Sequence, residues 1–486
     1  MIINRRGFLA VAAAGVAAAC TNKSEGDAAG SPPAAPAATP PAAVGQGLDV
    51  TLKPSETDID LGGVVVRTWA YDGQVPGREL RLQKGAKLRA QVNNALPAET
   101  SVHWHGLAIP NPMDGVPPLT QQPIALGQGF TYEFTVPDAG TYWYHSHVGT
   151  QLDRGLYGPL IIEDPAETVN WDEELVLVLD DWIDGTGKNP DQVYAELRQT
   201  GMPPMGPMGP DAGVTPTTPL GADGGDVTYP YYIINGRVNK DPQVVDYKAG
   251  QRIRLRIINA GSDSAFRVGI PDTPMMVTHT DGFPVVQKPT DSVILGMGER
   301  VDAIVTVNSS VPVVAIPERK DGYAQLNLKV SGAASTVNVD EFVKRLNGSA
   351  PLDTATLTAT PDVQLTQREP NQTYDLRLAG PLTPYTWTIN GKTYNPPNDP
   401  LPLRQGQRVR VRYVNESKMF HPMHLHGHTF QVMSPNGPGP RKDTVLVPPL
   451  ATVDTVFDTN NPGKWIDHCH NTYHLESGMA VFFSYT

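Results

Sequence analysis

Hydrophobic and polar residues alternate over short stretches along most of this chain, which is typical of strands with one buried face. The clearest alternation occurs in three similar copies. Each copy starts at a glycine and ends, nine residues later, at an asparagine: residues 85–94, 250–259 and 406–415. A dipeptide typical of tight turns between strands precedes each copy: Asp72-Gly73, Asn235-Gly236 and Asn390-Gly391. The pattern predicts a β-domain that is repeated three times.

The positions of the copies suggest the domain boundaries. We expect the first domain over residues 48–165, the second over 171–332 and the third over 360–486. Residues 333–359 are expected to form a linker with a short helix at 339–346. A long insertion rich in Gly, Pro and Met, residues 185–229, interrupts the second domain and has a helical pattern at 191–199. Insertions of this length are usually functional or mobile.

The composition favours many short strands. The 486 residues include 46 Gly and 47 Pro, and only 18% are charged, which disfavours long helices and charge-driven disorder. The net charge of -12 repels phosphate backbones, so we expect no nucleic-acid partner. No apolar run reaches the length of a membrane-spanning helix.

The N-terminus has the features of an export signal. Arg5-Arg6 precede an apolar stretch over residues 8–19, and the whole resembles a twin-arginine signal at 1–19. The small residues before Cys20 resemble a lipoprotein cleavage box; the alternative is an ordinary cleavage site with Cys20 incidental. Residues 20–47 are rich in Ala and Pro and are predicted to be a tether. We therefore expect export by the twin-arginine machinery to the periplasm or the outer face of the cell membrane, with membrane contact only through a lipid at Cys20.

Eleven of the twelve histidines lie in four clusters, all within the predicted first and third domains. Histidines without a common role would not segregate in this way, and imidazole is the usual ligand of copper and zinc. The pattern therefore predicts metal binding. The clusters are His103-Trp104-His105, His145-Ser146-His147, His421 with His424, His426 and His428, and His468-Cys469-His470 with His474.

The sequence His468-Cys469-His470 implies two different metal sites. Residues i and i+2 of a strand face the same side, so the two histidines point one way and Cys469 points the other. His421 and His474 could join Cys469 on its side, and Met479 could supply a weak axial ligand, which is the blue-copper arrangement. A zinc site would usually have more thiolates or a carboxylate, and an iron–sulfur cluster needs more cysteines than the two of this chain.

Eight histidines remain for the opposite side of that strand. They are too many for one metal and suit three copper ions. They come equally from the first and third domains, so we expect a site where these domains meet. The eight are His103, His105, His145, His147, His424, His426, His468 and His470.

These four motifs resemble those of the multicopper oxidases, a family of laccases, cuprous oxidases and ferroxidases. The resemblance covers the three-domain body and implies an all-β fold of three consecutive cupredoxin-like Greek-key β-barrels. It also implies four copper ions, one of type 1, one of type 2 and two of type 3. By this resemblance type 1 copper takes His421, Cys469 and His474 with Met479 axial; type 2 takes His103 and His424; one type 3 ion takes His105, His145 and His470, and the other His147, His426 and His468.

The resemblance also implies a mechanism. A reducing substrate gives single electrons to type 1 copper through an exposed edge of His474. The electrons then cross Cys469 to the neighbouring histidines, and four of them reduce dioxygen to two waters. Asp114 matches an acid that lies near the three-copper site in the family, and we predict that it relays protons. The alternative is a turn residue, since Asp114-Gly115 is also a turn signal.

The reducing substrate is suggested by three methionines in the insertion, Met202, Met205 and Met208. Thioethers favour Cu(I), and exported copper-tolerance oxidases of the family carry Met-rich insertions, so Cu(I) is the favoured substrate, with phenol oxidation as a side activity. The alternatives are a flexible loop with incidental methionines, a laccase-like oxidase of phenols or aromatic amines, and a non-enzymatic copper-storage lipoprotein.

Overall fold

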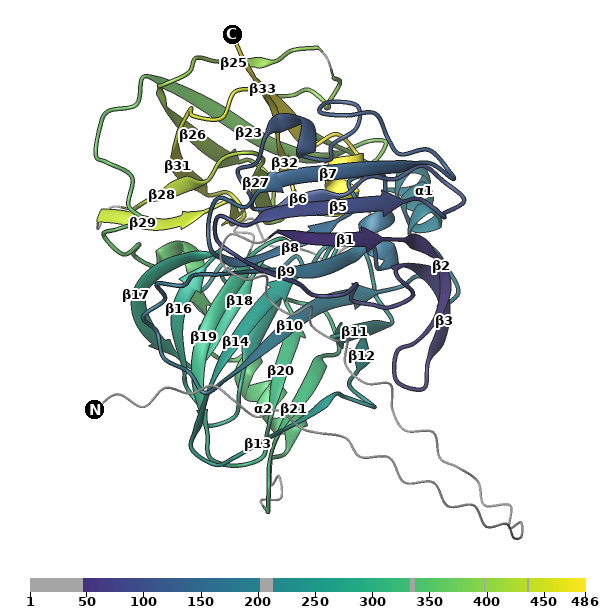
Figure 1. Cartoon of the computed structure of the whole chain (residues 1–486), viewed down its shortest axis with the longest axis vertical. Helices are drawn as coiled ribbons and strands as arrows, with labels where there is room; N and C mark the ends of the chain where they lie inside the picture. Colours follow the sequence, from purple (N-terminus) through teal and green to yellow (C-terminus); the bar gives the residue numbers. More distant parts are fainter. Residues whose placement is uncertain (1–46, 202–212, 333–336, 397, 435–436) are drawn as a thin grey trace. The chain divides into compact units, whose positions relative to one another are not determined.

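The computed structural model describes residues 47–201, 213–332, 337–396, 398–434 and 437–486 (Figure 1). Three predicted features lie outside these residues: the export signal over 1–19, Cys20 with most of its tether, and the methionines Met202, Met205 and Met208. Among the described residues, no helix is both long and apolar enough to cross a membrane.

The first part of the body forms two sheets and a hairpin. The three-stranded sheet consists, in spatial order, of β1 (Leu48–Leu52), β5 (Lys87–Asn93) and β7 (Gly129–Thr135). The four-stranded sheet consists of β4 (Leu80–Gln83), β9 (Tyr157–Glu163), β8 (Gly140–His145) and β6 (His103–His105). The hairpin is β2 (Pro54–Asp60) with β3 (Val65–Tyr71). One apolar cluster contains residues of both sheets, among them Leu88 and Leu160, so the sheets share a core.

The second part also forms two sheets. The seven-stranded sheet consists of β12 (Arg237–Val238), β11 (Tyr231–Ile234), β10 (Glu173–Trp182), β14 (Gln251–Asn259), β19 (Arg300–Val307), β16 (Met275–Thr280) and β17 (Phe283–Thr290). The six-stranded sheet consists of β13 (Val244–Tyr247), β21 (Ala324–Val330), β20 (Val311–Pro317), β15 (Phe266–Gly269), β18 (Ser292–Leu295) and β22 (Leu352–Asp353).

The third part repeats this plan, so three two-sheet units follow one another and the predicted all-β class is confirmed. Its six-stranded sheet consists of β24 (Thr386–Ile389), β23 (Gln372–Leu382), β26 (Arg408–Asn415), β31 (Thr452–Asp458), β28 (Phe430–Ser434) and β29 (Gly437–Lys442). Its five-stranded sheet consists of β25 (Leu401–Leu403), β33 (Ala480–Tyr485), β32 (Lys464–Cys469), β27 (His421–Leu425) and β30 (Thr444–Val447).

Helices are short and connect the strands. The predicted helical patterns at 191–199 and 339–346 are confirmed by α1 (Pro190–Thr200) and α2 (Val339–Asn347). Helix α1 begins at a capping box in which Asn189 and Gln192 each accept a hydrogen bond from the other's backbone N–H. The other helices are α3 (Thr472–Glu476) and the 3₁₀ turns η1 (Asn111–Met113), η2 (Gln151–Arg154) and η3 (Thr354–Thr356).

The three sequence copies occupy equivalent places in the three units. Strands β5, β14 and β26 each pair in parallel with the strand that opens their unit, namely β1, β10 and β23. On the other side each pairs antiparallel with a later strand, namely β7, β19 and β31. The glycine that begins each copy has a φ of 81°, 83° or 82°, a conformation that favours glycine. The repeat therefore marks one structural position used three times.

The asparagine at the end of each copy holds the loop that follows its strand. Asn94, Asn259 and Asn415 are buried, and each side-chain amide donates hydrogen bonds to at least two carbonyls. Each side-chain oxygen also accepts a hydrogen bond from the N–H two residues later. Only an amide offers donors and an acceptor in this way, which explains why asparagine recurs.

We expect Asn259→Ala to lower the free energy of unfolding by about 2–4 kcal/mol, because it removes the partners of the Gly261 N–H and of two buried carbonyls. Chemical denaturation followed by tryptophan fluorescence would measure the change. Asn308→Ala, on the exposed surface of the same unit, is the control and should change stability by less than about 0.5 kcal/mol. Equal stabilities of the two variants would contradict the role of Asn259.

Candidate metal centre

The predicted histidines of the first and third units come together where β6, β27 and β32 end. Strand β6 pairs with β8, so that His103 lies opposite His145, and β27 pairs with β32, so that His424 lies opposite His468. Between the two units, the Nε2 atoms of His103 and His424 are 3.5 Å apart. Those of His147 and His468 are 3.4 Å apart. Four segments that are distant in the sequence therefore share one imidazole cluster.

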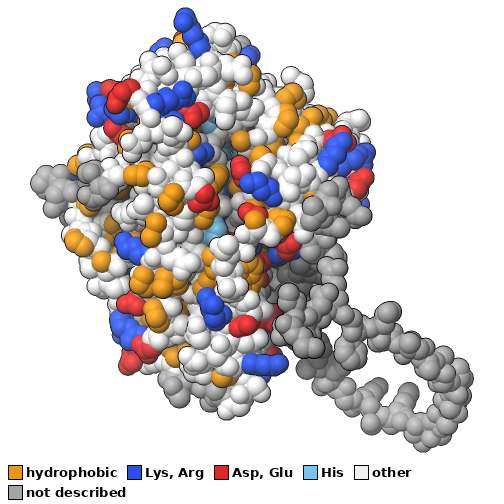
Figure 2. Space-filling model, turned by 60° about the vertical axis from the view of Figure 1, so that its left-hand side comes forward, with side chains coloured by type: hydrophobic (Ala, Val, Ile, Leu, Met, Phe, Trp, Pro, Cys, Tyr) orange, Lys and Arg blue, Asp and Glu red, His pale blue; other side chains and the backbone are white. Residues whose placement is uncertain are grey.

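Several subsets of this cluster could each hold a metal ion, because their ligand atoms lie within 4.8 Å of one another. Two subsets consist of three histidines each, including one residue next to Cys469, and a third joins His103 and His424 with His105. Nearly all of these side chains are buried, and Figure 2 shows only small patches of histidine on the surface that it presents. The subsets are His105 with His145 and His470, His147 with His426 and His468, and His103 with His105 and His424.

The hydrogen bonds of these imidazoles fit a metal. In eight of the ten predicted ligand histidines one ring nitrogen has a protein oxygen within hydrogen-bond distance, which leaves the other nitrogen with a lone pair. The buried Nδ1 of His105 and the Nε2 of His145 have no hydrogen-bond partner, nor does either nitrogen of His470. The eight are His103, His105, His145, His421, His424, His426, His468 and His474.

The distances between facing nitrogens also fit. Two nitrogens bound to one metal at about 2 Å lie roughly 3.3 Å apart in a tetrahedral site. The Nε2 atoms of His426 and His468 are 3.1 Å apart, and the Nδ1 atoms of His421 and His474 are 3.2 Å apart. Uncharged ring nitrogens that face each other without a shared proton are otherwise unfavourable, so the arrangement suits a cation between them.

Burial keeps these imidazoles neutral. Desolvation lowers the pKa of His147 to about 3 and lowers the pKa of seven other predicted ligand histidines below the ordinary value. A neutral imidazole has the lone pair that a metal needs. The other members with a lowered pKa are His105, His145, His421, His424, His426, His468 and His470.

Two further subsets include a residue other than histidine: one joins Asp114 to His103 and His426, and the other contains the thiol. The Cys469 Sγ lies 3.5 Å from His474 Nδ1 and 3.7 Å from His421 Nδ1, and all three side chains are fully buried. Burial raises the pKa of the Cys469 thiol, so metal binding would have to displace its proton. Thiolate with two imidazoles is a donor set that suits copper. His468 and His470 lie in the other subsets, so the thiol and its neighbours serve opposite sides of the strand.

Short local contacts place the other members of the thiol site. The Asn471 side chain accepts hydrogen bonds from the N–H groups of Tyr473 and His474 and thereby starts α3. The carbonyl of Met479, a buried residue, accepts a hydrogen bond from the Cys469 N–H at 3.0 Å. The backbone of Met479 therefore lies next to that of Cys469.

The predicted exposed edge of His474 is wrong, because its ring is fully buried. Its Nε2 lies 3.0 Å from an oxygen of Asp226, and the ring of Trp387 stacks on its face with centroids 3.9 Å apart. Both covering residues are far from His474 in the sequence. Asp226 and Trp387 therefore separate at least part of the His474 ring from the outside.

Asp114 lies against two ligand histidines. It is fully buried at the end of η1, and its carboxylate accepts a hydrogen bond from His426 Nδ1 at 3.1 Å. Its carbonyl accepts one from His103 Nδ1 at 2.8 Å. The residue thus sets which nitrogen of each ring faces the cluster. The turn is also present: Gly115 has a φ of 82° and packs against the Val102 carbonyl.

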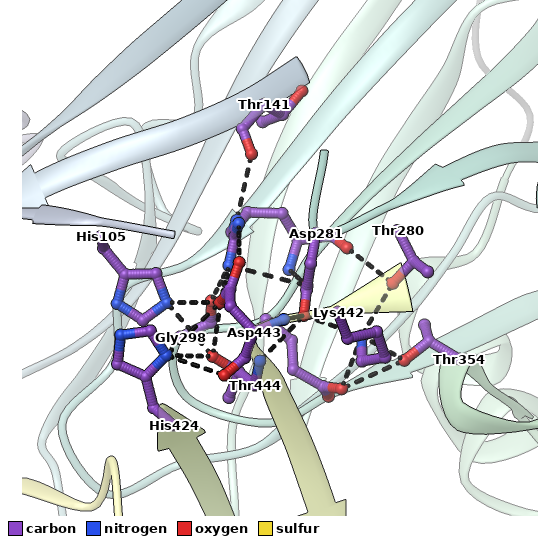
Figure 3. Close-up of polar contacts among 12 residues, drawn as sticks. His105, Thr141, Thr280, Asp281, Gly298, Thr354, His424, Lys442, Asp443 and Thr444 are labelled. Atoms are coloured by element: carbon purple, nitrogen blue, oxygen red, sulfur yellow. Dashed lines mark hydrogen bonds and ion pairs between the residues drawn. The ribbon is translucent and has the colours of Figure 1, made fainter. Parts of the chain in front are cut away.

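Asp443 plays the same role for His105 and His424 as Asp114 does for its two histidines. The sequence analysis did not predict it. Its carboxylate accepts a hydrogen bond from His105 Nε2 at 3.1 Å, and its carbonyl accepts one from His424 Nδ1 at 2.9 Å (Figure 3). Burial alone would raise the pKa of Asp443, but the Arg300 guanidinium outweighs burial and holds it well below its usual range. A single aspartate between two strands carries no motif, so the sequence offered no signal for it.

The two histidines without a predicted ligand role have protein partners instead. His428 Nε2 lies 2.7 Å from the Tyr485 hydroxyl, and His279 Nε2 lies 3.4 Å from a Glu167 oxygen. Neither belongs to any of the candidate subsets among the described residues. This agrees with the ligand set predicted for the other ten.

Comparison with known proteins gives one consistent family. Sequence models described as multicopper oxidase match residues 54–167, 173–316 and 367–486, which together are most of the chain. Each match falls on one of the three two-sheet units.

Individual relatives agree. The chain is 43% identical to "Multicopper oxidase MmcO" of Mycobacterium tuberculosis, with 99% of this chain and 96% of the relative covered. It is 27% identical to "Copper resistance protein A homolog" of Pseudomonas syringae pv. tomato, with 89% and 91% covered. Among solved structures, the laccase from Botrytis aclada superposes with a TM-score of 0.74 at 26% identity, over 90% of this chain and 88% of the laccase.

Proposed function

This chain belongs to the multicopper oxidase family and is therefore an oxidoreductase that uses oxygen. From this premise, we propose that it holds four copper ions and that it oxidises Cu(I) in preference to phenols. The observation that carries the proposal is the division at His468-Cys469-His470, where the thiol joins one candidate site and both imidazoles join the others. Neighbouring residues of one strand thereby link the site that takes electrons to the site that uses them.

The proposed ligands follow the subsets described above. The type 1 ion would be held by His421, Cys469 and His474, with Met479 as the proposed weak further ligand. The type 2 ion would be held by His103 and His424. One type 3 ion would be held by His105, His145 and His470, and the other by His147, His426 and His468. The type 2 and type 3 ions would together form a trinuclear site. When bound, these copper ions would accept electrons singly and pass four of them to dioxygen, which becomes two waters.

The chain's own residues prepare this chemistry. Cys469 offers a covalent path, since only backbone separates it from the imidazoles of His468 and His470. Asp114 is the proposed proton relay: its carboxylate is buried, lies 3.1 Å from His426 Nδ1 and 3.3 Å from His103 Nδ1, and thus can hold a proton beside the trinuclear site.

The acidic groups near His474 support the hypothesis that the electron donor is a cation. Asp226 lies on the outer nitrogen of His474 and also accepts a hydrogen bond from the Tyr385 hydroxyl. Asp223, three residues away, is buried, and desolvation raises its pKa to about 7. Carboxylates at the point where electrons enter attract a metal cation more strongly than a neutral phenol, which supports a cationic donor.

The Met-rich insertion is the proposed collector of Cu(I). Its methionines Met202, Met205 and Met208 lie outside the described residues, but both flanks reach α3, which carries His474. On one flank the Tyr194 hydroxyl donates to the Glu476 carbonyl at 2.6 Å, and on the other Asp226 contacts His474. Soft thioethers favour Cu(I), which is why we assign this role to the insertion.

Two other functions remain as alternatives. A laccase-like oxidase would prefer phenols or aromatic amines, and the match to the Botrytis laccase supports this class. A copper-storage lipoprotein would bind copper without consuming oxygen. For each of these functions, the Arg5-Arg6 pattern supports export by the twin-arginine machinery to the periplasm or to the outer face of the cell membrane. Cys20 supports a lipid tether there.

We expect Cys469→Ser to abolish both the blue absorption of thiolate-bound copper and oxygen uptake, because a hydroxyl cannot replace the thiolate. Oxygen uptake with Cu(I), Fe(II) or a dimethoxyphenol as donor would measure turnover. Cys20→Ser, which changes the other cysteine, should retain both properties. Oxidase turnover in Cys469→Ser would refute the proposed electron path, and an absence of turnover in the wild type would indicate a copper store.

We expect Asp114→Asn to slow reoxidation by dioxygen about 100-fold while the blue absorption stays unchanged, because the amide keeps the contact with His426 but holds no mobile proton. Stopped-flow mixing of the reduced enzyme with oxygen would measure the rate. Asp458→Asn, a half-buried aspartate of the third unit, is the control. Unchanged reoxidation in Asp114→Asn would remove its proton role.

We expect replacement of Met202, Met205 and Met208 by Ser to lower kcat/KM for Cu(I) about tenfold, which corresponds to about 1.4 kcal/mol, with little change for a dimethoxyphenol. Met433→Ser, an exposed methionine on β28, controls for loss of a surface thioether. Equal effects on both donors would reject the role of the insertion.

A further inference from the structure

The second unit contributes no ligand atom to any candidate metal subset among the described residues, yet it touches the trinuclear site. Gly298, in the turn before β19, lies so close to the imidazoles that a Cβ there would be 2.9 Å from His470 and 3.0 Å from His105. Its φ of 87° is one that glycine adopts without strain. The second unit therefore forms part of the wall around the imidazoles.

Arg300, at the start of β19, makes the strongest of these contacts. Its guanidinium is fully buried and forms a two-pronged ion pair with Asp443, with N–O distances of 2.7 and 2.6 Å. Its remaining contacts include the carbonyls of Thr141 and Gly298, both at 3.0 Å. One side chain of the second unit is thus tied to the first unit, to the third unit and to the turn that lines the site.

Asp443 carries this contact to the ligands. As described above, its carboxylate orients His105 and its carbonyl orients His424, which are ligands proposed for two different kinds of copper. The Thr444 hydroxyl donates to the same carboxylate at 2.9 Å. A change in the position of Asp443 would rotate both imidazoles.

The neighbouring residue anchors the same segment on the opposite side. Lys442 is fully buried, and its ammonium lies 3.1 Å from both Asp281 and Glu299 of the second unit. Because successive residues of an extended segment point to opposite sides, Lys442 enters the second unit while Asp443 faces the histidines. Space around the ion pair is also restricted, since a Cβ at Gly106 would be 2.5 Å from the Arg300 guanidinium.

We propose that Arg300 is a positioning residue for the trinuclear site, which acts through Asp443 to hold His105 and His424 in register for copper. The inference rests on the proposed copper function. It assigns to the ligand-free second unit a specific task, namely to fix the orientation of imidazoles that the first and third units supply. A guanidinium suits this task because its planar fork matches a carboxylate, which the ammonium of lysine cannot do.

The test compares Arg300→Lys with Arg267→Lys in the copper-loaded full chain. Arg267 is the matched control, since it is buried in the same unit and forms a similar two-pronged pair with Glu318, at 2.7 and 3.0 Å. The measurements are the hyperfine splitting of the type 2 EPR signal, the affinity for type 2 copper and the blue type 1 absorption. For Arg300→Lys we expect an altered splitting and type 2 copper bound about 10- to 100-fold more weakly, with normal blue absorption.

A wild-type EPR signal and copper affinity in Arg300→Lys would overturn the inference, as would an equal loss in Arg267→Lys. If Arg300→Lys does not fold, the double variant Arg300→Gln/Asp443→Asn removes both charges of the pair, so that neither partner is left alone. It should show the same altered splitting, and a normal splitting would overturn the proposal. Absence of a type 2 signal in the wild type would instead refute the proposed copper function, so the two failures are distinguishable.

Discussion

Alternation of side chains along β32 is the constraint on which the rest of the site depends. His468 and His470 face one side of the strand and Cys469 faces the other, so one short segment serves two sites. The distance between the site of Cys469 and the sites of His468 and His470 is fixed, because covalent backbone connects these residues. Every other predicted ligand must then be delivered to one of two positions, and the remaining strands and loops of the first and third units are arranged to do so.

Burying so many imidazoles in one place is unfavourable unless their ring nitrogens have hydrogen-bond partners. Two aspartates provide it in parallel: Asp114 contacts His103 and His426, while Asp443 contacts His424 and His105. In each case the carbonyl serves one ring and the carboxylate the other. The same pairing appears in the ring stacks, since His103 lies on His426 and His105 on His424, both with centroids 3.8 Å apart. The first and third units thus contribute equivalent halves.

Local patterns predicted much of this structure. The Gly-to-Asn repeat predicted equivalent strands, because few residues can replace the glycine that begins each copy or the asparagine that ends it. The spacing of the histidines predicted which of them meet. Contacts between distant, isolated residues could not be predicted in the same way. Asp443 and Arg300 are single charged residues without periodicity, and the cover on His474 comes from Asp226 and Trp387, which no local pattern connects to it. The sequence therefore predicts which histidines meet better than it predicts what surrounds them.

The most direct test of the account is anomalous X-ray diffraction at the copper edge from crystals of the copper-loaded protein. The account predicts four anomalous peaks, with one beside the Cys469 sulfur and three among the imidazoles that the first and third units share. A peak at Cys469 with none among those imidazoles, or copper bound at other parts of the body, would contradict it.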